Sequence, residues 1–111
     1  MEYKFEKIGN VLKVALEGRL VAACSEEFKN KVLEHLADNK NILLDMTNMS
    51  HIDSSGLGAL VVLLQKANAV NGTVKLACLQ PRPRIVIDIT KVYRVFEIFD
   101  SVEAALDSFK P

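Results

Sequence analysis

The sequence has few of the residues that mark specialised protein classes. Its 111 residues include no tryptophan, two cysteines and three prolines, and 14 basic residues balance 14 acidic ones. A protein that binds duplex nucleic acid needs a surplus of clustered cations, so this charge balance argues against direct nucleic acid binding. Cys24 and Cys78 form no metal-type pair, and we expect free, core-facing thiols in a cytosolic protein.

Long apolar runs and a targeting segment are also missing. The longest unbroken apolar run is Ala59 to Leu64, whereas ~20 apolar residues are needed to cross a bilayer. No basic stretch leads into an apolar core at the N-terminus. We therefore expect a cytoplasmic protein without membrane insertion. Half of the residues are apolar and a quarter are charged, which predicts one globular domain over residues 1–111.

Hydrophobic patterning predicts alternating strands and helices. Period-two alternation indicates an antiparallel hairpin, and the apolar run at 41–46 is typical of a strand buried on both faces. This alternation predicts an α/β fold, with a mixed sheet of about five strands packed by about four helices. The predicted order is strands at 3–8 and 11–17, a helix capped by Ser25, a strand at 41–46, a polar connection at 47–52, a helix at 55–70, a strand at 73–79, a helix at 83–91, a strand at 95–99 and a last helix capped by Ser101.

The segment with the most informative chemistry runs from Asp53 to Gly58, between a buried strand and a buried helix. Its carboxylate and hydroxyls lie where a helix exposes free N–H groups, so this terminus can accept added negative charge. The simplest interpretation is that Asp53 or Ser54 caps the helix. Gly56 and Gly58 favour more than a cap, because each costs roughly 1 kcal/mol in a helix relative to alanine. Glycines here would let another backbone approach closely.

Spacing argues against an enzyme. A serine nucleophile elbow needs glycines two residues before and after the serine, and a phosphate-cradling loop needs a lysine directly after its last glycine. Neither pattern is present, and His35 and His51 share no metal-ligand spacing. No general base lies near either serine in sequence. We therefore expect no catalytic residue, metal or cofactor, and keep a serine hydrolase only as a control hypothesis.

Several motifs together resemble the STAS domain, the fold of bacterial anti-sigma-factor antagonists. Leu44-Asp45-Met46 is followed, after a spacer, by Ile52-Asp53-Ser54-Ser55-Gly56-Leu57-Gly58. Gly18-Arg19-Leu20 resembles the family's turn after the second strand, and 95–106 resembles its C-terminal half. The resemblance covers about 3–108 and implies a single STAS-like domain.

The resemblance also implies a function. In similar members the serine after the aspartate, here Ser54, is phosphorylated by a kinase that is itself the anti-sigma factor and has a histidine-kinase-like ATPase fold. The unmodified protein would bind this kinase and release a sigma factor, and a metal-dependent serine phosphatase would reverse the modification. The residues expected at the partner surface are Asp53, Ser54, Ser55, Gly56, Leu57, Gly58 and Val21.

Two positions depart from the family pattern. Val21 stands where many members carry an aspartate, and the apolar stretch from Val21 to Cys24 is either part of the contact surface or buried under the first helix. Lys91 occupies a turn that often holds a glycine, and we expect only that turn to be affected. The alternative function is a constitutive STAS-type subunit of an ATPase or signalling complex, without a phosphorylation cycle.

Overall fold

A five-stranded sheet in the order β1-β2-β3-β4-β5 forms the centre of the protein, whose computed structural model describes residues 1–110. β1 and β2 are antiparallel and the other neighbouring strands are parallel, so the sheet is mixed, as predicted. The strands are β1 (Glu2–Ile8), β2 (Val11–Leu20), β3 (Asn41–Ile52), β4 (Thr73–Ala77) and β5 (Ile98–Phe99). The α-helices are α1 (Ala22–Leu36), α2 (Ser54–Ala69), α3 (Pro81–Thr90) and α4 (Val102–Ser108).

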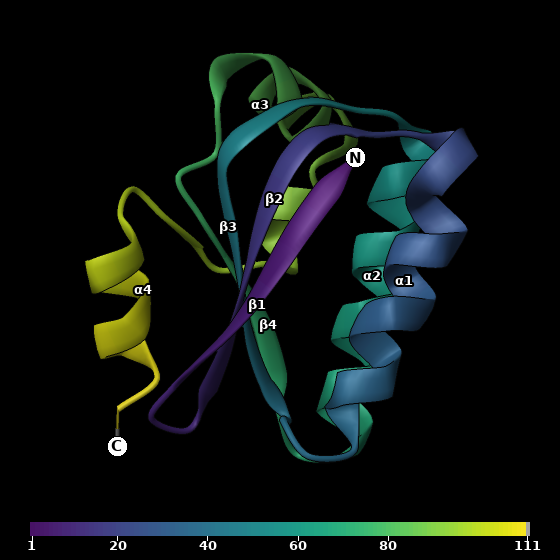
Figure 1. The fold of residues 1–111 in the computed structure, drawn as a ribbon. Helices are drawn as coiled ribbons and strands as arrows, with labels where there is room; N and C mark the ends of the chain where they lie inside the picture. The colour runs from purple at the N-terminus through teal and green to yellow at the C-terminus, as the bar shows by residue number, and fades with distance from the viewer. Residues whose placement is uncertain (111) are drawn as a thin grey trace.

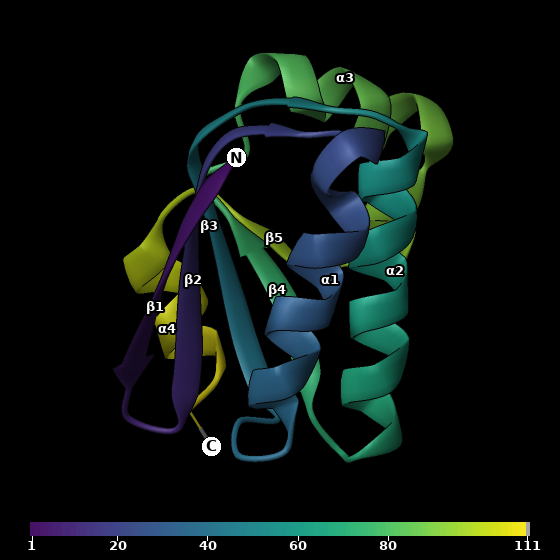
Figure 2. The ribbon, with the colours of Figure 1, turned by 45° about the vertical axis from the view of Figure 1, so that its right-hand side comes forward.

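The helices cover the sheet unequally. α1 and α2 lie side by side on one face, while the short α4 lies on the opposite face (Figure 1). α3 crosses the end of the sheet at which β3 leads into α2 (Figure 2). The N-terminal ends of α1 and α2 therefore lie together at the same end of the molecule as α3.

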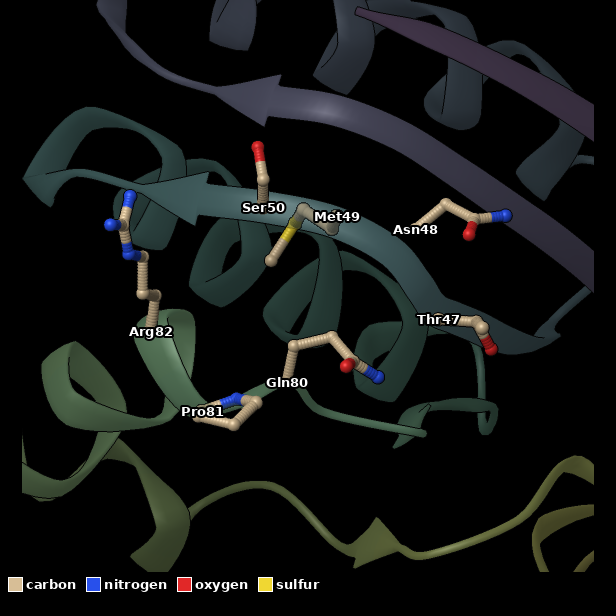
Figure 3. A pocket seen from close by; sticks show the side chains of 7 residues that line it. All are labelled: Thr47, Asn48, Met49, Ser50, Gln80, Pro81 and Arg82. Atoms are coloured by element: carbon tan, nitrogen blue, oxygen red, sulfur yellow. The ribbon is translucent and has the colours of Figure 1, made fainter.

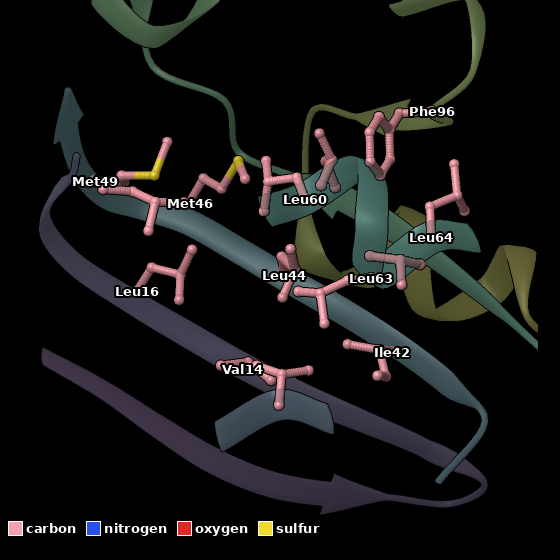
Figure 4. Packing of buried hydrophobic residues seen from close by; sticks show 14 of the residues in the cluster. Val14, Leu16, Ile42, Leu44, Met46, Met49, Leu60, Leu63, Leu64 and Phe96 are labelled. Carbon is pink, nitrogen blue, oxygen red and sulfur yellow. The ribbon is translucent and has the colours of Figure 1, made fainter. Parts of the chain in front are cut away.

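The main core fills the space between the sheet and the helices α1 and α2. In Figure 4, Val14, Leu44 and Leu63 are among the side chains that β2, β3 and α2 contribute to it. Each is at most 1% exposed, and full burial of such a side chain stabilises a fold by about 1.5–3 kcal/mol. A smaller cluster on the other face joins Leu43 to Ala105 of α4. β3 is thus buried on both faces, which confirms the prediction for 41–46.

The polar connection predicted at 47–52 is wrong, because β3 continues through this segment to Ile52. It stays paired with β2, where Asn48 lies opposite Glu17 and His51 lies opposite Arg19, across two shifts in register. The buried residues Met46, Met49 and Ile52 are spaced by three. A bulged strand of this kind does not show period-two alternation, so its pattern resembles a loop.

Several predicted ends also move. α1 begins at Ala22 rather than after Ser25, and Ser25 is a buried residue inside the helix rather than its cap. The last strand is restricted to Ile98–Phe99, because the amides of Val95 and Phe96 donate back to the Val92 carbonyl of a 3-10 turn at Val92–Arg94. Ser101 does cap α4, since its Oγ accepts from the amide of Ala104 at 3.1 Å. Both cysteines are free thiols, although each is only half-buried.

Candidate partner-binding site

The carboxylate of Asp53 joins the N-terminal ends of two helices. Its Oδ1 accepts a hydrogen bond from the Gly56 amide of α2 at 2.9 Å, and its Oδ2 accepts one from the Ala22 amide of α1 at 3.0 Å. The first bond is the local cap that the sequence predicts. The second spans 31 residues and explains why α1 begins at Ala22 without a capping side chain from its own sequence.

These amides also fix the charge of Asp53. The hydrogen bond from Gly56 lowers the pKa of the Asp53 carboxyl below its usual value of 3.8, and the bond from Ala22 acts in the same direction against an opposing desolvation. Hydrogen bonds to the ionised form favour it. Asp53 is therefore an anion at neutral pH whose two oxygens are both occupied, which makes it a poor general base.

Gly56 is required by close packing. A Cβ atom at this position would lie 2.2 Å from the backbone oxygen of Leu20. The same oxygen accepts a hydrogen bond from the Asp53 amide at 3.3 Å. The close approach of the end of β2 to the first turn of α2 thus needs a residue without a side chain. Here the expectation of a close backbone contact is met.

Gly58 differs from Gly56. No heavy atom lies within 4 Å of a Cβ built at Gly58, so the protein's own packing does not require glycine there. Gly58 instead lines an open groove of about 350 Å³ between α1 and α2. The other residues of the groove are Ser25, Glu26, Lys29, Ser55, Ala59 and Val62. The expected close backbone approach at Gly58 therefore has no partner within the described residues.

The predicted contact residues separate into exposed and buried ones. Ser54 is the first residue of α2; it and Ser55 are exposed, and among residues 1–110 the Oγ of Ser54 forms no hydrogen bond. Gly56 and Leu57 are buried in the domain. They support the shape of the helix start and do not lie on a surface that a partner could touch, whereas Ser54, Ser55 and Gly58 do.

Val21 lies beside this site rather than under the first helix. It is the half-buried residue that precedes α1, and Ala22 and Ala23 after it are exposed. Because the Ala22 amide donates to Asp53, the stretch begins next to the carboxylate that precedes Ser54. The stretch from Val21 to Cys24 is therefore divided: Ala22 and Ala23 are exposed, whereas Val21 is half-buried and Cys24 packs against the core.

A hollow of about 460 Å³ lies farther along β3, between Thr47–Ser50 and the start of α3 (Figure 3). Arg82 extends from α3 toward the end of β3, and its Nη1 lies 2.8 Å from Nε2 of His51. Because a guanidinium only donates, His51 accepts through Nε2. The side chain of His51 is therefore occupied and does not serve as a base for Ser54. Sequence reasoning missed this pair, whose partners are 31 residues apart.

Two further searches gave negative results over residues 1–110. No three His, Cys, Asp or Glu side chains come together as metal ligands would. None of the helices in this part of the chain has the length and apolar content that a membrane span requires.

Sequence comparison assigns the family. The profile of the STAS domain matches residues 2–105, and the chain belongs to this family. Its fold, one mixed five-stranded sheet with four α-helices, is the STAS fold.

Named relatives point to one group within the family. BtrV of Bordetella bronchiseptica, provisionally named an anti-sigma factor antagonist, is 26% identical over 99% of this chain and 96% of its own length. The anti-sigma F factor antagonist of Paenibacillus polymyxa is 24% identical over 96% of this chain and 92% of its own.

The solved structures of the Bacillus anti-sigma factor antagonist SpoIIAA share the fold. Its unphosphorylated form superposes with a TM-score of 0.84 at 21% identity, covering 96% of this chain and 95% of SpoIIAA. Its phosphorylated form gives a TM-score of 0.77 at 20% identity, covering 98% and 100% of the two chains.

Proposed function

We propose that this protein is an anti-sigma factor antagonist whose unphosphorylated form binds an anti-sigma serine kinase and thereby releases a sigma factor. Phosphorylation of Ser54 by that kinase would switch the interaction off, and a metal-dependent serine phosphatase would restore it. The observation that carries the proposal is the placement of Ser54: an exposed, unpaired hydroxyl on the first residue of α2, next to an anion that two helices hold in place.

Relatives support the general role. Three relatives carry names as anti-sigma factor antagonists, and SpoIIAA is known in unphosphorylated and phosphorylated forms. The site also favours a binding module over an enzyme, since His51 and Asp53 are both occupied by other groups and leave Ser54 without a base.

Electrostatics explain how one phosphate would act. A phosphate on Ser54 adds about −1.5 to −2 charges at pH 7. This charge would lie beside the ionised carboxylate of Asp53, which accepts hydrogen bonds from the amides of Gly56 and Ala22. A partner that covers Ser54 would have to desolvate both anions. Loss of about 3 kcal/mol of binding free energy lowers affinity more than a hundredfold. The helix N-terminus still tolerates the phosphate, so the fold itself survives.

The contact surface in this proposal consists of the exposed residues around Ser54. Ser55 and Gly58 line the groove between α1 and α2, and Val21 and Ala22 lie at the start of α1, where the Ala22 amide donates to Asp53. Gly58 leaves space into which a backbone segment of the kinase can fit. An apolar Val21, in place of the usual acid, suits a kinase with an apolar contact at this point.

The test uses the full chain and the histidine-kinase-like ATPases encoded in the same genome. We expect kinase and ATP to add one phosphate, located at Ser54 by mass spectrometry. Ser54→Ala should bind the kinase at least as well as wild type, and Ser54→Asp about a hundredfold more weakly. Ser55→Ala is the matched control and should still be phosphorylated.

Two results would contradict the proposal. One is equal affinity of Ser54→Ala and Ser54→Asp for the kinase. The other is a stable complex with an ATPase in which the protein from its native cell carries no phosphate, which would identify a constitutive subunit instead.

A further inference from the structure

Helix α3 and the turn after it expose most of the large apolar side chains on the surface. Four of the five such side chains among residues 1–110 lie there: Ile85 is 57% exposed, Ile89 74%, Tyr93 45% and Val95 59%. We call these four residues the α3 face. Pro83 and Ile87 are buried against the domain, so Ile85 and Ile89 point to the opposite side of the helix. Large apolar side chains that are exposed on one part of a protein are candidates for an interaction surface.

Opposite charges flank the α3 face along one side. Arg84 and Asp88 are one helical turn apart, and both line a hollow of about 510 Å³ beside α3. Neither forms an ion pair with any residue of the described chain. On α3 this flank therefore carries one unpaired cation and one unpaired anion, placed one turn apart beside Ile85 and Ile89, and Asp100 also lines the hollow.

We propose that the α3 face binds a second copy of this chain through an antiparallel, two-fold pairing of α3 with α3. In a two-fold interface each contact occurs twice, with the two residues exchanged. An antiparallel pairing sets Ile85 of one copy against Ile89 of the other. The two-fold axis also places the charged flanks of the two copies on the same side of the helix pair. Because the two helices run in opposite directions, Arg84 of each copy meets Asp88 of the other.

The charges of the whole protein agree with self-association. The formal net charge is zero, so no net charge of the whole chain keeps two copies apart. Around α3 itself the cations Arg82, Arg84, Lys91 and Arg94 outnumber Asp88 and Asp100, which weakens the pairing. The reciprocal Arg84–Asp88 pairs would be charge-assisted contacts at the rim of an apolar centre, which is the usual arrangement of a protein interface. A patch of four side chains is small, and we expect a weak, reversible dimer.

The exposed edge strand β1 is less suited to a second copy. Its exposed residues are all charged: Glu2, Lys4, Glu6 and Lys7. Charges along an edge strand protect it from pairing with another strand.

Sedimentation velocity of the full chain, from micromolar to millimolar concentration, tests the proposal. We expect wild type to show a concentration-dependent dimer. Arg84→Glu alone and Asp88→Arg alone each create two like-charge contacts and should raise the dimer Kd about tenfold or more. The double variant Arg84→Glu/Asp88→Arg restores opposite charges and should return Kd to within about threefold of wild type. Ile89→Glu should abolish the dimer.

Lys4→Glu is the matched charge reversal away from α3 and should leave Kd unchanged. Circular dichroism and thermal unfolding of every variant check that the fold is intact. A wild-type protein that stays monomeric throughout the concentration range overturns the proposal. So does a double variant that dimerises no better than the single ones, or a Lys4→Glu effect as large as that of Arg84→Glu.

Discussion

The start of α2 and the end of α3 differ in how well their residues suit the backbone conformation. At the start of α2, Asp53 accepts from the amides of two helices, and glycine stands at position 56, where a Cβ would collide with Leu20. At the end of α3, Lys91 adopts a left-handed conformation with φ of 60° and ψ of 25°, which favours glycine. At the start of α2, Asp53 and Gly56 each suit the backbone around them. At the end of α3, Lys91 holds a backbone conformation that is unfavourable for a residue with a side chain. Substitutions should cost stability in the first and can add stability in the second.

Gly56→Ala should give the largest effect. Its Cβ would lie 2.2 Å from the backbone oxygen of Leu20, which cannot swing away as a side chain can. Forced overpacking of this kind costs about 1–3 kcal/mol or more, so we expect Tm to fall by about 10 °C. Thermal unfolding followed by circular dichroism measures it.

Gly58→Ala is the matched control, two residues along the same helix. Its Cβ would meet no atom within 4 Å, and alanine favours a helix over glycine by about 1 kcal/mol. Tm should therefore rise by about 4 °C. If both variants shifted Tm by the same amount in the same direction, close packing against Leu20 would not explain Gly56.

Asp53→Asn should give a smaller loss, which depends on pH. Asparagine keeps one acceptor oxygen and so loses the bond to either Ala22 or Gly56. Because the pKa of Asp53 is lowered in the folded protein, its ionised form adds stability that is fully present above the usual value of 3.8. That stability disappears as the pH falls through the lower pKa of the folded state. Tm of Asp53→Asn should lie below wild type at pH 7, and the difference should shrink only below pH 3.8.

Ser101→Ala is the control for this pH dependence. Ser101 caps α4 through a neutral hydroxyl, and the loss of such a cap costs about 1 kcal/mol through a group that does not ionise in this range. Thermal unfolding at neutral pH and near pH 3 should show a constant difference for Ser101→Ala. A constant difference for Asp53→Asn as well would mean that the charge of Asp53 plays no part.

Local patterns predicted much of the fold. The continuous apolar run at 41–46 predicts a doubly buried strand, and the run at 55–70, rich in leucine and valine with few charges, predicts a buried helix. The extension of β3 to Ile52 could not be predicted in the same way. It depends on pairing with β2 across two register shifts, and that pairing leaves no period-two pattern in the sequence.

In the candidate site, too, local features could be predicted from the sequence and long-range contacts could not. Asp53 as the cap of α2 was one of the readings open from the sequence, since its partner is three residues away, whereas its bond to Ala22 crosses 31 residues and was missed. Gly56 and Gly58 look equivalent in the sequence. Only the position of Leu20 separates a glycine that the fold requires from one that it does not. The phosphorylation of Ser54 stays a prediction.

Lys91→Gly should give the smallest effect, and of the opposite sign. The left-handed conformation costs a residue with a side chain about 1–2 kcal/mol, and glycine adopts it freely but loses more entropy on folding. The net gain should be about 0.5–1 kcal/mol, or a few degrees in Tm, measured by thermal unfolding. Lys91→Ala removes the same charge and keeps a Cβ, so it should give no gain. An equal rise in both variants would assign the effect to the lysine charge, and the end of α3 would then be no more strained than the start of α2.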